Sequence, residues 1–348
     1  MDIVKIFIPT TLAFIIGILI TPIVSNFLYK NKMWKKKSVA VATDGGMATI
    51  TQGLHNDENI KTPRMGGIII WASALITILL IYLASQIDGP IMTKLNFLSR
   101  NQTWLPIFTL IVGALVGLVD DYFSVTERYD QKAGGLSSKK RLLAVFIISL
   151  IGAWWFYTKL EMTSIMIPFW GIWDAGWLFI IFFVLVTLGT YSGGVIDGLD
   201  GLSGGVFGII FGAYGIIALL QNQIDLAAFC FVLVGGILAF LWFNIPPARF
   251  YMSETGTMAL TITLVVVAFL TQQVLILPII AFPLVISSAS SIIQLASKKF
   301  RNGKKVFLVA PLHHHFQALG WPATKVVMRY WILGIICASL GIIIALIG

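Results

Sequence analysis

Charged residues are scarce in this sequence. Asp, Glu, Lys and Arg together make up 11% of the 348 residues, whereas 58% are hydrophobic. A soluble domain carries about 25% charged residues. The composition therefore excludes an ordinary soluble protein and predicts an integral membrane protein. The sequence also lacks a G-x-x-x-x-G-K-[ST] motif, so a P-loop nucleotide hydrolase is not indicated.

Cysteine and histidine are rare as well. The two cysteines, Cys230 and Cys337, both lie inside apolar runs, so neither a disulfide framework nor a zinc site is predicted. Of the four histidines, three are consecutive in "APLHHHFQALGW", residues 310–321. Such a concentration in a largely apolar chain needs an explanation from the membrane topology and from the positions of the acidic residues.

Long apolar runs recur along the chain. A membrane span needs about 20 apolar residues, and continuous rather than alternating runs predict helices. Residues 257–297 carry no charge and would measure about 60 Å as one helix, so we expect two crossings there. We predict an all-α, polytopic protein with a single integral membrane domain, residues 1–348, and about ten spans. They lie near residues 3–28, 66–86, 104–120, 141–158, 175–192, 204–220, 226–243, 257–271, 274–296 and 328–347.

The basic residues predict the orientation of the chain. With the amino terminus outside, only Lys5, Lys94, Arg100 and Lys159 of the 24 Lys and Arg fall outside, which leaves 24 − 4 = 20 inside. This is a strong positive-inside bias. The net charge of +9 then reflects topology and attraction to anionic membrane lipid, and we expect no nucleic-acid partner. Both termini are predicted outside, and the inner loops are residues 29–64, 120–140, 193–204, 244–257 and 298–326.

Acidic residues gather at the predicted inner ends of the spans. A carboxylate at a helix C-terminus opposes the helix dipole, so capping does not explain Asp120 and Asp121 and we favour a function. Asp197 and Asp200 share one face if their segment is helical, and we favour a function for them, although Asp200 or Ser203 could instead cap the next helix. Glu254 could act in function or simply compensate the dipole at the start of its helix.

The histidine run has several interpretations: a metal site, a pH sensor or polar loop filler. Three consecutive side chains cannot comfortably bind one ion, because on a helix they point about 100° apart. We favour one or two of His313, His314 and His315 facing a ligand, as phosphate hydrogen-bond donors or proton carriers. Carboxylates bind phosphates through Mg²⁺, which neutralises both. The residues therefore predict a membrane enzyme that acts on a diphosphate with Mg²⁺.

Six motifs follow one another between about residue 62 and residue 335: "TPRMGG", "GLVDDYF", "DGLDGL", "FNIPPARFYMSETGT", "APLHHHFQALGW" and "MRYWILG". In this order they resemble phospho-N-acetylmuramoyl-pentapeptide transferases (the MraY family), within the polyprenyl-phosphate sugar-1-phosphate transferase superfamily. The resemblance implies ten transmembrane helices with both termini outside. It also implies a multi-pass enzyme of the bacterial cytoplasmic (inner) membrane, with its active site facing the cytoplasm.

The reaction that the resemblance implies belongs to peptidoglycan synthesis in the cell wall. Such an enzyme moves phospho-MurNAc-pentapeptide from UDP-MurNAc-pentapeptide onto undecaprenyl phosphate, giving lipid I and UMP, with Mg²⁺ as cofactor. The expected partners are therefore these two substrates and membrane lipid, while a homodimer is left open.

The resemblance also implies roles for individual residues. Asp120 and Asp121 match an aspartate pair, of which one deprotonates or orients the lipid phosphate, and Glu254 stands at the metal-binding aspartate. We predict that Asp120, Asp121 and His314 are catalytic and that Glu254 binds the metal. The predicted substrate-binding residues are Thr62, Lys139, Asp197, Asp200, Asn244, Tyr251, Gln294, His313 and His315.

The chain departs from the family pattern at several positions. The usual M-G-D-T-G-S is "MSETGT" at residues 252–257, the usual N-L-T-D is "GVID" at 194–197, T-P-T-M-G-G has Arg64, and Gln317 replaces a glutamate. Glutamate reaches one methylene further than aspartate, and Ser253 lacks the freedom of glycine at positive φ. We therefore expect Glu254 to hold the metal in a locally shifted loop.

Two alternatives remain open. A related polyprenyl-phosphate transferase would use another UDP sugar. A transporter is the remote alternative, because intramembrane carboxylates often mark ion paths. A transporter predicts ionisable residues near span centres, whereas here they cluster at inner ends.

Overall fold

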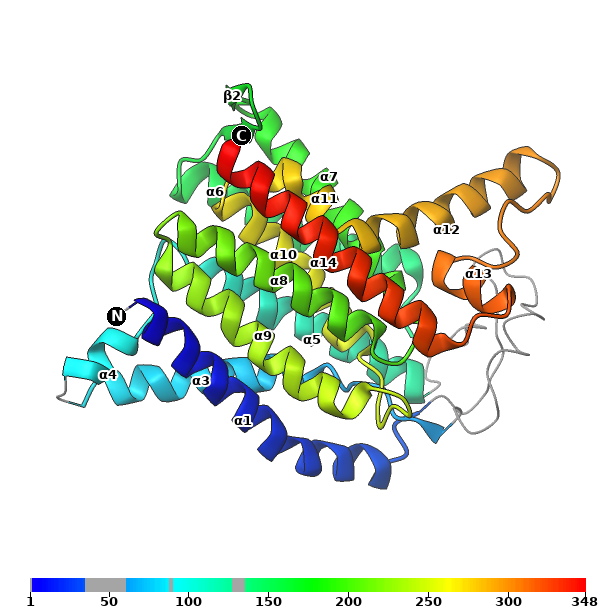
Figure 1. Cartoon of the computed structure of the whole chain (residues 1–348), viewed down its shortest axis with the longest axis horizontal. Coiled ribbons are helices and arrows are strands. Elements are labelled where there is room, and N and C mark those ends of the chain that lie inside the picture. Colours follow the sequence, from blue (N-terminus) through cyan, green and yellow to red (C-terminus); the bar gives the residue numbers. More distant parts are fainter. Residues whose placement is uncertain (1, 35–60, 88–89, 127–134) are drawn as a thin grey trace.

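The computed structural model describes residues 2–34, 61–87, 90–126 and 135–348 (Figure 1). Residues 35–60 and 127–134, which belong to the predicted inner loops 29–64 and 120–140, lie outside the described residues. The described chain consists of helices and one short hairpin. The helices are α1 (Asp2–Lys30), α3 (Ile68–Ser85), α4 (Pro90–Leu95), α5 (Trp104–Thr126), α6 (Ser138–Lys159), α7 (Leu178–Ser192), α8 (Leu202–Leu220), α9 (Ile224–Asn244), α10 (Ser253–Leu270), α11 (Leu277–Ile280), α12 (Phe282–Phe300), α13 (Leu312–Ala318) and α14 (Ala323–Ile347).

The number of membrane-spanning helices agrees with the sequence analysis. Within the described ranges, nine helices are long and apolar enough to cross a membrane, and a bent helix pair over 274–300 can provide a tenth crossing. The predicted all-α, polytopic class is therefore confirmed. Both chain ends lie on the left of Figure 1, whereas α13 lies on the right. We call the end of the bundle that carries α13 the site end.

One predicted span has a different shape. We predicted a helical span near residues 274–296, and the structure has two helical arms there in place of one straight helix. A short 3₁₀ helix (Val274–Ile276) and α11 lead into α12, and the two arms are bent by 81°. Pro278 and Pro283 each lie in the first turn of a helix, where proline is tolerated because its missing N–H is not needed there. The continuous hydrogen-bond ladder is thus interrupted, and α12 leaves the bundle (Figure 1).

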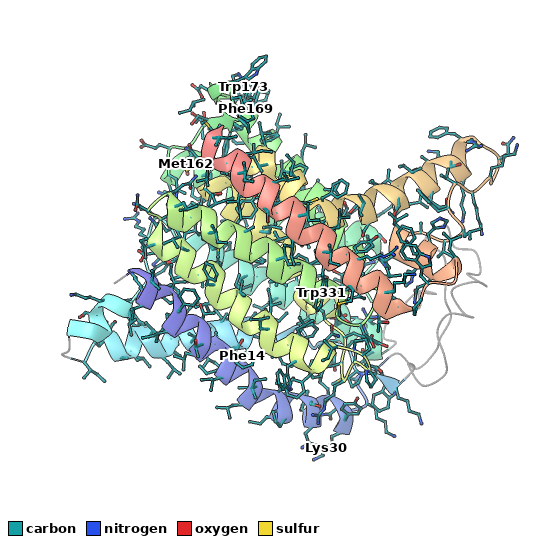
Figure 2. The ribbon with its side chains drawn as sticks, in the orientation of Figure 1. Phe14, Lys30, Met162, Phe169, Trp173 and Trp331 are labelled. Carbon is teal, nitrogen blue, oxygen red and sulfur yellow. The ribbon has the colours of Figure 1, made fainter. Side chains whose placement is uncertain are left out.

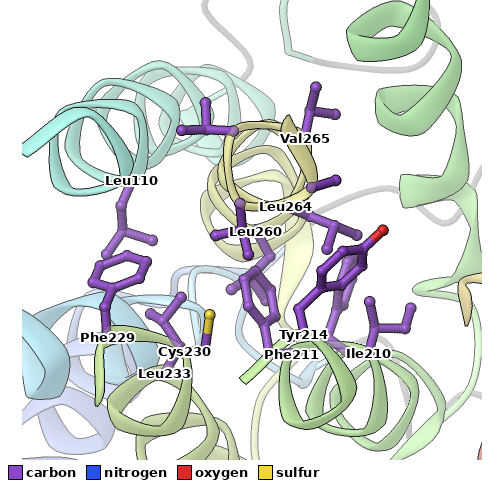
Figure 3. Packing of buried hydrophobic residues seen from close by; sticks show 14 of the residues in the cluster. Leu110, Ile210, Phe211, Tyr214, Phe229, Cys230, Leu233, Leu260, Leu264 and Val265 are labelled. Carbon is purple, nitrogen blue, oxygen red and sulfur yellow. The ribbon is translucent and has the colours of Figure 1, made fainter. Parts of the chain in front are cut away.

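Helix α10 forms the buried centre of the bundle. Glu254 is the only one of its residues that is not buried. Figure 3 shows Leu260 and Leu264 of α10 amid side chains of α5, α8 and α9, such as Leu110, Phe211 and Phe229. A helix that is apolar on every face is expected in such a core. This packing holds the first turn of α10 at a fixed place at the site end.

Two glycines let α5 lie very close to α10. A Cβ atom on Gly113 would be 2.9 Å from the Cα of Ala259, and one on Gly117 would collide with the backbone of Glu254. Small residues allow this kind of close helix packing. The next turn of α5 carries Asp120 and Asp121, which therefore lie beside the first turn of α10. Because α5 continues to Thr126, the aspartate pair is inside the helix, whereas we had expected it at the helix end.

The small hairpin was not predicted from the sequence. Strand β1 (Ser164–Ile167) pairs antiparallel with β2 (Gly171–Asp174), with Ser164 opposite Asp174. Phe169 at the turn donates its N–H to the carbonyl of Gly348 at 3.1 Å. Figure 2 shows Phe169 and Trp173 far from α13. The hairpin therefore contributes nothing to the site end.

Candidate active site

The segment "TPRMGG" is tied by its backbone to the loop that precedes α10. Tyr251 donates its N–H to Pro63 (2.9 Å) and accepts from the N–H of Gly66 (2.8 Å). The predicted substrate-binding residues Thr62 and Tyr251 also share a side-chain hydrogen bond. Burial raises the pKa of Tyr251, and the bond with Thr62 opposes that rise. This pairing places the Arg64 side chain next to α5.

Asn244 joins two other loops at the site end. Its Oδ1 accepts from the N–H of Gly201 at 2.9 Å, and its Nδ2 donates to the carbonyl of Phe250 at 2.8 Å. The residue is almost completely buried. Asn244 therefore holds the "DGLDG" loop, residues 197–201, against the segment that enters α10.

Asp121 is saturated with donors. Its Oδ1 accepts from Arg64 Nε at 3.1 Å, with Nη2 of the same guanidinium also at 3.1 Å. Its Oδ2 accepts from the backbone N–H and the hydroxyl of Thr255, at 2.9 and 2.7 Å. A carboxylate at the N-terminus of a helix is favoured by the unpaired N–H groups and the dipole there. Asp121 thus caps α10 from another helix.

Asp197 is a second cap on the same helix. Its Oδ2 accepts from the N–H of Ser253 at 2.7 Å, and its Oδ1 accepts from the Ser203 hydroxyl at 2.7 Å. Burial raises the pKa of Asp197, while these two hydrogen bonds lower it. Asp197 and Asp200 lie in a turn after the 3₁₀ helix Gly193–Ile196, so the shared helical face considered above does not exist.

The backbone of Ser253 differs from what we expected of a serine at this position. Ser253 has φ +56°, the left-handed region in which glycine is most at ease. Serine therefore does not exclude the positive φ here. The N–H of Ser253 is held by Asp197 in this conformation.

Glu254 forms an ion pair with Arg141 of α6. Arg141 Nη1 lies 2.6 Å from Glu254 Oε1, and the Tyr191 hydroxyl donates to Oε2 at 3.4 Å. The same Nη1 is 3.8 Å from Asp120 Oδ2. The guanidinium of Arg141 thus lies between two of the predicted functional carboxylates.

Asp120 has the least occupied carboxylate of this group. Its Oδ1 accepts from the N–H of Leu136 at 2.6 Å. Gly135 (φ +78°) allows this contact, because a Cβ there would lie 3.0 Å from Asp120 Oδ1. Oδ2 makes no hydrogen bond within the described residues. The cation closest to it among them is Arg141, whose Nη1 lies 3.8 Å away. Asp120 therefore keeps one oxygen available for a ligand.

The three consecutive histidines lie in two different environments. His313 and His314 are buried, and the Nε2 atoms of both lie so close to Gly198 that a Cβ there would meet them at 2.5 and 2.8 Å. His314 Nδ1 is 2.8 Å from Gln317 Oε1. His315 turns away and accepts from the N–H of Leu308 through Nδ1, at 3.2 Å. Two imidazoles thus face the "DGLDG" loop, and the third holds the segment before α13.

His313 is the least solvated of the three. Neither of its ring nitrogens has a hydrogen-bond partner among the described residues. Burial lowers the pKa of His313 well below its usual value, and the neighbouring His314 lowers it further. His313 is therefore neutral in the folded protein, with two buried nitrogens available to a ligand.

The remaining predicted residues have structural contacts or lie at the surface. Asp200 Oδ2 accepts from the N–H of Ala248 at 3.0 Å. Gln294 accepts from the N–H groups of Val306 and Phe307, both at 3.0 Å, and donates to Phe307 O at 2.8 Å. Lys139 is exposed in the first turn of α6. Gln294 thus fastens α12 to the loop before the histidines.

The carboxylates at the site differ in whether they have an oxygen available to coordinate Mg²⁺. Mg²⁺ is usually held by one or two carboxylates together with substrate phosphates. Both oxygens of Asp121 and of Glu254 already have donors, and the described residues contain no group of three His, Cys, Asp or Glu placed to hold a metal. Of Asp120, Asp121 and Glu254, Asp120 fits a one-carboxylate site best, because its Oδ2 has no hydrogen bond among the described residues. The metal role of Glu254 stays a prediction.

Sequence reasoning missed both arginines of the site. Arg64 and Arg141 were assigned to membrane topology as part of the positive-inside count. Arg64 pairs with Asp121 across 57 residues of sequence, and Arg141 pairs with Glu254 across 113. The signal that could have found Arg64 is its departure from the "TPTMGG" pattern.

The amino-acid sequence is similar to those of known proteins. Residues 103–272 match the family model described as "Glycosyl transferase family 4". The phospho-N-acetylmuramoyl-pentapeptide-transferase of Listeria innocua is 34% identical over 337 residues, 96% of either chain. The protein of that name from Bacillus anthracis is 34% identical over 336 residues, 95% of either chain. That from Listeria monocytogenes is 33% identical, again over 96% of both chains.

Proposed function

Because this chain belongs to the phospho-N-acetylmuramoyl-pentapeptide-transferase family, we propose that it transfers phospho-MurNAc-pentapeptide from UDP-MurNAc-pentapeptide to undecaprenyl phosphate. The products are lipid I and UMP. It is a membrane-embedded transferase of the glycosyl-phosphate class. The observation that best supports the proposal is Asp120, whose Oδ2 is available beside the Arg141 guanidinium.

The chemistry is a substitution at phosphorus. An oxygen of the lipid phosphate attacks the sugar-bearing β-phosphorus, a new P–O bond forms, and the bond from that phosphorus to the bridging oxygen breaks. UMP leaves with the electron pair. Such reactions depend mainly on positioning and on charge stabilisation. Asp120 Oδ2 positions the acceptor phosphate, and the guanidinium of Arg141 offsets negative charge.

The charges at the site support a Mg²⁺ requirement. Three carboxyl groups, those of Asp120, Asp121 and Glu254, have only two guanidinium partners among the described residues, those of Arg64 and Arg141. A diphosphate adds more negative charge, which needs a further cation. Asp120 would hold Mg²⁺, which supplies charge neutralisation when it is bound. The buried His313 and His314 serve as hydrogen-bonding groups for the substrate, with His314 as the proton carrier.

The protein in this proposal spans the bacterial cytoplasmic membrane, with both termini outside and the site end in the cytoplasm. The distribution of Lys and Arg along the sequence supports this orientation. It also brings the site to the water-soluble nucleotide sugar, while the lipid acceptor arrives from within the bilayer.

A UMP-release assay tests the function. Purified protein in nanodiscs is mixed with UDP-MurNAc-pentapeptide and undecaprenyl phosphate, with and without Mg²⁺. We expect UMP release that needs both substrates and falls to background with a chelator. If UMP is released from a different UDP sugar and not from UDP-MurNAc-pentapeptide, the protein is a related polyprenyl-phosphate transferase with another donor.

A further inference from the structure

Arg141 has a donor that the protein leaves unused. Its Nη1 is held by Glu254 at 2.6 Å, but its Nε is buried without a hydrogen-bond partner among the described residues. A buried unpaired N–H is costly, and native structures seldom keep one without a reason. The orphaned Nε therefore points to an acceptor that arrives with a ligand.

The geometry of a guanidinium restricts what that acceptor can be. Arginine presents its N–H groups as a rigid planar fork, which suits carboxylate and phosphate oxygens. The nearby carboxylates approach the other edge, because Asp120 and Glu254 both face Nη1. A phosphate is the anion that the proposed reaction brings to this place.

Glu254 explains why Arg141 is held in this orientation. Its side chain reaches across from α10 to α6, with Oε1 on Arg141 and Oε2 on the Tyr191 hydroxyl. With Oε1 paired to Arg141 at 2.6 Å and Oε2 facing the Tyr191 hydroxyl at 3.4 Å, Glu254 is placed as a side-chain support for Arg141. An aspartate, one methylene shorter, would not span the same gap without backbone movement.

From these contacts we propose that Arg141 binds a phosphate oxygen of the donor diphosphate through its Nε edge. Glu254 is the positioning residue that orients it. The assignment rests on the proposed function for the identity of the diphosphate. In this assignment Arg141 contributes to the affinity for the donor, and Glu254 is a support for Arg141 in place of a metal ligand.

The first experiment measures donor binding without turnover. Binding of UDP to the protein in nanodiscs, without the lipid acceptor, is compared for the wild type, Arg141→Gln and Arg141→Lys. We expect about tenfold weaker binding or more for Arg141→Gln. The lysine variant keeps the charge but not the fork and should lie in between. Arg100→Gln, at an exposed arginine far from the site end, is the matched control and should bind as the wild type does.

The second experiment separates the two roles of Glu254. We expect Glu254→Gln and Glu254→Asp to raise the KM for the donor several-fold while the Mg²⁺ concentration for half-maximal activity stays within twofold. Binding of Mn²⁺, followed by electron paramagnetic resonance, should likewise be unchanged in Glu254→Gln. The double variant Arg141→Gln/Glu254→Gln should have the same KM for the donor as Arg141→Gln alone, because Glu254 then has no guanidinium to orient.

The outcomes that overturn the assignment differ from those that overturn the function. Equal UDP binding by the wild type and a folded Arg141→Gln protein would refute the role of Arg141. Loss of Mn²⁺ binding in Glu254→Gln would make Glu254 a metal ligand. A wild-type protein that binds UDP through Arg141 but transfers no phospho-MurNAc-pentapeptide would refute the proposed function alone.

Discussion

At the scale of residues, acids that look equivalent in the sequence have different partners. Asp121 and Asp197 cap α10 and Glu254 supports Arg141, so of these four acids only Asp120 has an oxygen without a hydrogen bond among the described residues. Adjacent aspartates on a helix point in different directions, so Asp120 and Asp121 meet different neighbours. These contacts are the reason why we propose a reacting role for Asp120 and supporting roles for the other three acids.

We expect Asp120→Asn and Asp121→Asn to lose activity to a similar extent but to differ in stability. Both should lower turnover by at least ~100-fold, because Asp120→Asn removes the carboxylate that we propose positions the acceptor phosphate and Asp121→Asn displaces the site around it. Only Asp121→Asn should lower the unfolding free energy, by about 2 kcal/mol, since it leaves Arg64 without its charged partner. Thermal unfolding and UMP release measured on both variants check this. Equal stability of the two would contradict the capping role of Asp121.

His313 should make the protein less stable in mild acid. The unfolded histidine has a pKa of about 6.5, while burial lowers the pKa of His313 in the folded state. Below about pH 6.5 the unfolded state therefore binds a proton that the folded state does not, and stability falls by up to about 1.4 kcal/mol per pH unit. Above about pH 7 the effect disappears.

Unfolding of the wild type and of His313→Gln between about pH 5 and pH 8 measures this contribution. The stability of the variant should depend less on pH in the acid range. The same slope in both proteins would mean that His313 is protonated in the folded state.

Ser253→Gly should stabilise the protein. Ser253 holds φ +56°, a conformation that costs a non-glycine residue about 1 kcal/mol. Glycine adopts it freely, so we expect the midpoint of thermal unfolding to rise while UMP release is retained. Ser192→Gly, at a serine with φ −58°, is a control that should give no such rise.

At the scale of elements, the first turn of α10 organises the site. Its N–H groups are bound by Asp121 of α5 and Asp197 of the "DGLDG" loop, and its Glu254 contacts Arg141 of α6. Close packing of α5 on α10 through Gly113 and Gly117 makes these contacts reachable. The positions of the acids therefore depend on helix spacing.

Gly117→Ala should consequently damage both stability and activity. The added Cβ would collide with the backbone of Glu254, and forcing helices apart typically costs about 1–3 kcal/mol. Gly212→Ala, in α8 with nothing within 4 Å of the new Cβ, is the matched control. Alanine favours a helix over glycine, so the control should be neutral or stabilising. A Gly117→Ala protein as stable and active as the control would show that α5 and α10 are less tightly packed.

At the scale of the whole molecule, the two chain ends lie at the end of the bundle opposite α13 (Figure 1). If the orientation proposed from the basic residues holds, both ends are outside and the loop with Lys304 and Lys305 is inside. Cysteine introduced at residue 2 or 348 should then react with a membrane-impermeant maleimide in intact cells. Cysteine at residue 303 should react only after permeabilisation. Labelling at 303 in intact cells would reverse the orientation.

Features that depend on local composition follow from the amino-acid sequence alone. Apolar runs of about 20 residues specify helices and spans, because backbone polar groups in lipid must be satisfied within the helix. The motifs around Asp120, Asp197 and His313 likewise indicate the candidate site from their residue types and order. Even so, hydropathy did not predict the bend before α12, where the apolar run continues but the helix does not.

Which charges meet depends on tertiary packing. Arg64 reaches Asp121 and Arg141 reaches Glu254 across 57 and 113 residues of sequence. No local pattern encodes such a pair, because it depends on the spacing of helices that glycines bring together. The histidine run shows the same limit. Its three identical neighbours have different roles because His313 and His314 pack against Gly198, while His315 faces another loop.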